Sequence, residues 1–165
     1  MDSAALKALQ QPLKEQYRAE PESAVVTLHA EGRLGEGVTC SVETGRALVE
    51  AGLHPATGGD GSLVCSGDML LQALVACAGV TMRSVATSLG LDVEGSVRAE
   101  GDLDFRGTLA VAKETPVGFR AIRLVFDLES VASEDELATL LRLTERYCVV
   151  FQTLAGSPAL SVERT

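Results

Sequence analysis

Two cysteines stand where thiol chemistry is expected. Cys77 lies in the middle of Ser66–Gly90, a long apolar run that has the character of a buried helix. Cys148 lies much later in the chain, near the end and on the buried face of a second helical pattern, which Ser133 and Glu136 open as a capping box. Thiolates are nucleophiles, and two neighbouring thiols can be converted to a disulfide and back. We therefore expect the fold to bring these two sulfurs together.

The surroundings of Cys77 bear on its reactivity. Cys77 is in mid-helix, so the N-terminus of its own helix cannot lower its pKa, and a nearby cation is required. Arg33, in a glycine-flanked turn after the first expected strand, is the leading candidate for this cation. An equally good interpretation is that Arg33 is an ordinary solvent-exposed arginine. Thr81, Ser84 and Ser88 make the same helix face less apolar, as the wall of a site would be. The simpler interpretation is that Cys77 only fills the core.

The other cysteines and the histidines suggest fewer roles. Cys40 alternates with strand valines and is expected to be a core residue. Cys65, directly before the central helix, is an alternative partner for Cys77. His54, in the Gly-rich loop Gly52–Gly61, is a weak candidate for a Cys–His nucleophile pair. The loop itself either lines a cavity near Cys77 or is a plain connector between elements. No spacing of Cys and His favours a structural zinc site.

Alternation and helical spacing predict the elements that position these residues. The expected order is an N-terminal helix, a strand hairpin, the central helix, two more strands, a helix and a short last strand, which is an α+β class. Their approximate ranges are Ala4–Ala19, Val25–Ala30 with Val38–Val42, Ser66–Gly90, Asp92–Gly107 with Phe119–Leu128, Ser133–Cys148, and a strand around Leu160 and Val162.

Composition narrows the classes of function. The 165 residues suit one domain, and a formal net charge of −9 argues against nucleic acid or an anionic membrane as partner. The central run is judged too short for a membrane span because Gln72 and Arg83 interrupt it. No secretory signal is recognised at the start, so the expected location is the cytoplasm, where cysteines stay reduced.

Two stretches carry a resemblance to a known family. Gly67–Thr81, read as GDMLLQALVACAGVT, resembles the first cysteine helix of the OsmC/Ohr family, the osmotically inducible and organic hydroperoxide resistance proteins. Glu145–Leu154, read as ERYCVVFQTL, is similar to the second cysteine motif of that family. The order and separation of the motifs also fit. The resemblance covers residues 21–165 as the OsmC-like domain, with residues 1–20 as an added helical arm.

The resemblance implies a fold, a partner and a reaction. The fold is α+β, with antiparallel sheets packed around long central helices in an intertwined homodimer. The reaction is thiol-dependent reduction of organic hydroperoxides, in which Cys77 is the peroxidatic thiol and Cys148 the resolving one. Arg33 corresponds to the activating arginine. No bound cofactor is implied, but an external dithiol such as a dihydrolipoyl group on a partner protein resets the pair.

Two further expectations concern the substrate-binding residues and one position at which the chain departs from the pattern of the peroxidases. Thr81, His54 and Cys65 are the candidate substrate-binding residues. The peroxidases carry a Glu ten residues before the first cysteine, where this chain has Gly67. Asp68 is expected to be the N-cap of the central helix. The alternatives are therefore a non-catalytic ligand-binding or redox-sensing module of the same fold, or a purely structural role for the thiols.

Overall fold

The structure is a computed structural model, and it describes most of the chain from residue 48 onward. The described residues are 2–5, 8, 10, 11, 19, 32–34, 39–43, 48–110 and 112–164, with the backbone alone for 32–34, 39–43 and 48. Most of the helix expected over Ala4–Ala19 and the whole strand expected over Val25–Ala30 lie outside these residues. The division into an arm and a domain stays a prediction.

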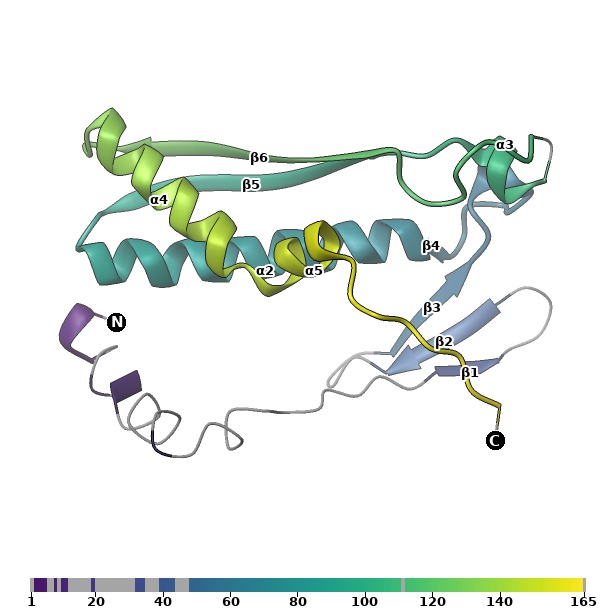
Figure 1. Cartoon of the computed structure of the whole chain (residues 1–165), viewed down its shortest axis with the longest axis horizontal. Coiled ribbons are helices and arrows are strands. Elements are labelled where there is room, and N and C mark those ends of the chain that lie inside the picture. The colour runs from purple at the N-terminus through teal and green to yellow at the C-terminus, as the bar shows by residue number, and fades with distance from the viewer. Residues whose placement is uncertain are drawn as a thin grey trace. The chain divides into compact units, whose positions relative to one another are not determined.

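The described elements form an α+β chain, as expected (Figure 1). In order they are β1 (Gly32–Leu34), β2 (Thr39–Glu43), β3 (Leu48–Gly52), the 3-10 helix η2 (Pro55–Thr57), β4 (Val64–Cys65), α2 (Ser66–Leu89), β5 (Val93–Asp102), α3 (Phe105–Thr108), β6 (Ala121–Ser130), α4 (Glu134–Tyr147) and α5 (Val149–Gly156). The chain divides into two compact units. The first contains Met1–Gln10, Ala73–Arg98 and Leu124–Thr165, and the second contains Gln11–Gln72 and Ala99–Arg123.

The second unit holds a four-stranded sheet in the order β1-β2-β3-β4. The first three strands are antiparallel, whereas β4 runs parallel to β3, so the expectation of purely antiparallel sheets is wrong at this edge. Arg33 belongs to β1 and pairs with Ser41, so the turn predicted around it is also wrong. The strand β3 was not expected, because its sequence lacks a long alternating run. Backbone pairing with β2 makes this segment a strand, although its side-chain pattern does not predict one.

The helix α2 has one buried stripe. Its buried residues recur every fourth position, on one helix face: Leu74, Ala78, Met82 and Ala86. Val80 is 73% exposed, so burial on nearly all sides is wrong within a single chain.

With 24 residues α2 is also long and apolar enough to cross a membrane, so excluding a span on length was wrong. The core helix of a globular domain has the same length and composition, and the absence of a membrane partner stays a prediction.

The first unit is packed around that stripe. Met82 and Ala86 of α2 form a core cluster with Val93 of β5 and Leu140 of α4. Phe126 and other half-buried residues of β6 pack against it, which confirms the predicted inward face of that strand. The predicted capping box of α4 is also confirmed, because Ser133 and Glu136 cap each other reciprocally. The two-stranded β5–β6 sheet and α4 therefore hold α2 on its buried side.

Leu140 tests this packing. Its side chain is fully buried in the cluster, so Leu140→Ala should lower the free energy of unfolding by about 2–5 kcal/mol through lost burial and a cavity. Val131→Ala is the matched control, because Val131 is fully exposed and its truncation should change stability by less than about 0.5 kcal/mol. Chemical denaturation measures both. Equal stability of the two variants would show that α4 does not pack as described.

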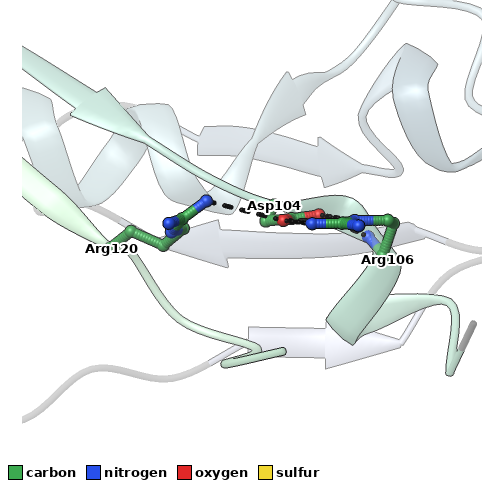
Figure 2. A network of polar contacts seen from close by, with 3 residues as sticks. All are labelled: Asp104, Arg106 and Arg120. Carbon is green, nitrogen blue, oxygen red and sulfur yellow. Dashed lines mark hydrogen bonds and ion pairs between the residues drawn. The ribbon is translucent and has the colours of Figure 1, made fainter. Parts of the chain in front are cut away.

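Two further differences concern the ends of elements. The strand expected at Leu160 and Val162 is absent from the described residues 157–164, where both side chains are more than nine-tenths exposed. The short helix α3 was not expected, and Asp104 explains it. Its carboxylate accepts from the backbone N–H of Arg106 as the N-cap, and it also pairs with the guanidinium groups of Arg106 and Arg120 (Figure 2). The hydrogen bonds from Arg106, aided by Arg120, lower the pKa of Asp104 to about 2.

Candidate functional site

Cys148 lies at the junction of two helices in the first unit. It is the C-cap of α4 and the N-cap of α5, and its extended backbone, with ψ of 107°, interrupts the helical path. Its N–H still donates to the carbonyl of Thr144 at 2.9 Å, and its carbonyl accepts from the N–H of Gln152 at 2.9 Å. The side chain is fully buried, as its helical spacing predicted. The chain therefore restarts a helix directly after this thiol.

Cys77 lies against the beginning of α5. The first N–H groups of a helix have no partner within the helix and point outward from its N-terminus. Here the backbone N–H groups of Val149 and Val150, the thiol of Cys148 and the hydroxyl of Thr81 are near enough to Cys77 to lower the pKa of its thiol. The structure thus brings together three of the predicted site residues: Cys77, Cys148 and Thr81.

The two thiols differ in acidity. Burial alone would raise the pKa of Cys77, but the hydrogen bonds from Val150, Cys148, Val149 and Thr81 outweigh it and lower the pKa below that of an ordinary thiol. Burial raises the pKa of Cys148, and an ionised Cys77 beside it adds to that increase. The pair therefore loses its first proton mainly from Cys77. Cys148 remains a neutral donor to the resulting thiolate.

The source of this acidity corrects one expectation. A nearby cation was expected because the N-terminus of α2 is too far from Cys77, but the pKa of Cys77 is lowered instead by N–H groups at the N-terminus of a different helix, α5. The second cysteine motif carried no clear signal of this arrangement. Val149 and Val150 continue the apolar pattern of α4, and only their β-branched side chains slightly disfavour a continuous helix.

The pH dependence of alkylation tests the donors. Cys77 should react with iodoacetamide along a titration whose midpoint lies below that of a free thiol, because the folded pKa is lowered. Thr81→Val removes one donor to the thiolate and should move the midpoint upward. Thr87→Val is the control, since that hydroxyl donates to the carbonyl of Arg83 instead. Identical midpoints in wild type and Thr81→Val would contradict the contact.

The other predicted site residues lie in the second unit. Arg33 is in β1, and its side chain is outside the described part of the structure, so its role stays a prediction. His54 and Cys65 line a cavity of about 350 Å³ together with Gly67 and Phe105. The His54 ring stacks on Phe105 with centroids 4.8 Å apart, and its Nδ1 accepts from the N–H of Ala56 at 3.0 Å.

The first turn of α2 contains Gly67, at the position where the resemblance implies a Glu. The helix begins at Ser66, so Asp68 is in the first turn and is not the N-cap, contrary to expectation. A Cβ atom at Gly67 would lie 3.4 Å from Phe119 and 3.6 Å from the Cys65 sulfur, which are ordinary contacts. Crowding at the Cβ position therefore does not explain the glycine. Its effect is to leave the cavity without a carboxylate at this position.

Comparison with solved structures shows the same fold in several proteins. An OsmC-like protein from Mycoplasma pneumoniae has 17% sequence identity and a TM-score of 0.67, over 79% of this chain and 89% of that one. An organic hydroperoxide resistance protein OsmC from Legionella pneumophila, also described as a predicted redox protein, has 18% identity and a TM-score of 0.58. That match covers 81% of this chain and 92% of the other. At these identities the likeness shows the fold.

Sequence comparison shows the family. No curated protein matches the chain. The family model described as OsmC-like protein matches residues 59–163, which include both cysteine motifs and most of the described elements. The resemblance seen in the sequence is confirmed, and the chain belongs to the OsmC-like protein family.

Proposed function

We propose that this protein is a thiol-dependent peroxidase that reduces organic hydroperoxides through Cys77, with Cys148 as the resolving thiol. One observation carries the proposal: Cys77 has Cys148 and the first residues of α5 as neighbours, and their N–H and S–H groups lower the pKa of Cys77. These donors favour the nucleophilic thiolate and keep the second thiol within reach of the first. Ser or Thr cannot replace that chemistry, because their hydroxyls are not ionised at neutral pH.

The proposed reaction has three steps. The Cys77 thiolate attacks one oxygen of the O–O bond, the alcohol leaves after taking a proton, and Cys77 becomes a sulfenic acid. The Cys148 thiol then attacks that sulfur, water leaves and a Cys77–Cys148 disulfide forms. Finally an external dithiol transfers two electrons to the disulfide and is itself oxidised. Both cysteines are free thiols in the structure, which corresponds to the state before the first step.

The family gives independent support of a coarser kind. Members of this family are linked to peroxide and redox chemistry, and the similar Legionella pneumophila structure is named as an organic hydroperoxide resistance protein. Cys77 is half-buried and Cys148 is fully buried, so a small peroxide reaches Cys77 more readily than Cys148. This difference in exposure supports giving the first step to Cys77.

The decisive assay measures hydroperoxide loss. The protein is mixed with tert-butyl hydroperoxide and dihydrolipoamide, and the remaining peroxide is followed with time. We expect multiple turnovers, with an intramolecular disulfide seen by mass spectrometry when the dithiol is omitted. Reaction no faster than that of a free thiol such as N-acetylcysteine would sink the peroxidase proposal.

A homodimer and a cytoplasmic location are part of the same proposal. Apolar residues of α2 and α5 remain exposed in one chain, with Val80 at 73% and Val149 at 69%. A second copy is the simplest cover for them, since exposed apolar surface of this kind favours association. Sedimentation at micromolar concentration should give the mass of a dimer, and a stable monomer would contradict this. A reducing cytoplasm would keep both thiols ready to react.

One observation favours a different function. Gly67 stands where the peroxidases carry Glu, and it lines a cavity that also includes His54 and Cys65. A non-catalytic module could hold a small ligand in that cavity while its thiols react slowly. The peroxidase assay separates the two functions, because a binding module would show no turnover with either hydroperoxide or dithiol.

A further inference from the structure

A second cavity of the first unit adjoins Cys148. Its volume is about 340 Å³, and it is lined by residues of β6, α4 and α5. The walls include the apolar side chains of Phe126, Leu141 and Phe151, and the charged residues Arg142 and Glu145 also line it. Of the two reactive thiols, the described lining includes Cys148 and not Cys77. A molecule in this cavity therefore lies beside Cys148, whose side chain is fully buried, and not beside Cys77.

Thr144 provides a second, independent sign of a ligand. It lines the same cavity one helical turn before Cys148, and it is only 1% exposed. Its Oγ1 has no hydrogen-bond partner within the described structure. An unpaired buried hydroxyl costs free energy, and native proteins rarely keep one without a use. A bound molecule with a polar atom beside Cys148 would satisfy it.

We propose that this cavity is the entrance through which an organic dithiol reaches the oxidised cysteine pair, and that the dithiol attacks the sulfur of Cys148. The inference rests on the proposed function. A hydroperoxide is a less suitable occupant, because its target is Cys77, which does not line the cavity. The apolar walls suit an aliphatic stem that carries the thiols. The Thr144 hydroxyl can donate to the incoming thiolate.

The exchange step balances with the dithiol as the only added reactant. Its thiolate attacks the Cys148 sulfur, a mixed disulfide forms there, and Cys77 leaves as a thiolate. The second thiol of the reductant then attacks its own sulfur in that bond, and Cys148 leaves and takes a proton. The products are a protein dithiol and an oxidised, cyclic reductant.

The direction of attack agrees with the donors around Cys77. A sulfur leaves faster when its thiol is more acidic, and the N–H groups of Val149 and Val150 favour Cys77 as a thiolate. Attack from the other side would expel Cys148, whose burial disfavours its charged form. Thiol exchange also needs the nucleophile to approach opposite the leaving sulfur. Cys77 is not part of the described cavity lining, so a thiolate in the cavity does not have to pass Cys77 to reach Cys148.

The first test locates the mixed disulfide. The Cys77–Cys148 bond is formed with diamide, so that the test does not depend on peroxidase activity. The disulfide form then receives one equivalent of 2-mercaptoethanol, a monothiol that has no second thiol with which to cyclise and release Cys148, and the reaction is stopped with acid and N-ethylmaleimide. Peptide mapping should find 2-mercaptoethanol on Cys148 and maleimide on Cys77. The reverse pattern would overturn the proposal, whether or not the protein consumes hydroperoxide.

The second test removes the hydroxyl. Thr144→Val keeps the size of the side chain, and it should slow reduction of the preformed disulfide by dihydrolipoamide about tenfold, the effect of losing one donor to a charged group. The rate at which hydroperoxide oxidises Cys77 should stay unchanged. Thr139→Val, on the same helix but outside the described cavity lining, is the matched control. An unchanged reduction rate in Thr144→Val would overturn the proposed contact.

A stability measurement separates this role from a structural one. Because Thr144 Oγ1 has no partner in the described structure, Thr144→Val should raise the melting temperature of the ligand-free protein. A variant that is more stable yet slower to be reduced fits a hydroxyl kept for a ligand. A lower melting temperature would show that the hydroxyl supports the fold, and it would count against the proposal.

Discussion

Hydroperoxide consumption should fall to the uncatalysed rate when Cys77 is replaced by serine. The peroxide oxygen is transferred to sulfur, and serine offers neither a sulfur atom nor an ionised group at neutral pH. The donors around the site would then face a neutral hydroxyl. The expected loss is on the order of a thousandfold or more, as for the removal of other covalent nucleophiles. Peroxide loss with dihydrolipoamide in excess measures it.

Two controls decide whether the loss belongs to Cys77. Cys40→Ser, in β2, should keep wild-type turnover, because Cys40 is expected to be a strand core residue. Circular dichroism and thermal melting should show that Cys77→Ser is folded. Retention of more than about a tenth of the wild-type rate in a folded Cys77→Ser protein would contradict the role given to Cys77.

The sequence predicted the positions of the thiols better than the source of their reactivity. Helical spacing placed Cys148 on a buried face, and the capping box marked the start of α4 at the correct residues. Both features depend on residues that are close together along the chain, so their pattern can be recognised in a single sequence. The break at Cys148 and the contact of Cys77 with α5 depend on packing between distant segments. No local pattern signals such a contact.

The strands illustrate the same limit. The second strand of the predicted hairpin agrees with β2, but Arg33 is in a strand and not in a turn, and β3 was not expected. Gly32 beside Arg33 suggested a turn, and pairing with β2 overrides that local preference. For α2 the sequence correctly indicated an apolar helix. Burial of its exposed side by a second copy stays a prediction.

Cys148→Ser should stop the reaction after a single turnover. Cys77 is still present and should react once with the hydroperoxide, because three of its donors are independent of the Cys148 sulfur: Val149, Val150 and Thr81. Serine cannot condense with a sulfenic acid to form a disulfide, so the oxidised state should persist and be labelled by a dimedone reagent. Steady-state turnover with dihydrolipoamide should fall by at least about a hundredfold, as expected when a group needed to complete the cycle is lost.

Cys65→Ser separates this outcome from the alternative resolving thiol. If Cys148 resolves, dimedone should label Cys148→Ser after peroxide treatment and should not label Cys65→Ser, which still forms the Cys77–Cys148 bond. The opposite pattern would transfer the resolving role to Cys65, which lines the separate cavity of the second unit. The structure favours Cys148, because its thiol is near enough to lower the pKa of Cys77 before oxidation. Condensation would then join two neighbouring thiols at the point where α4 ends and α5 begins.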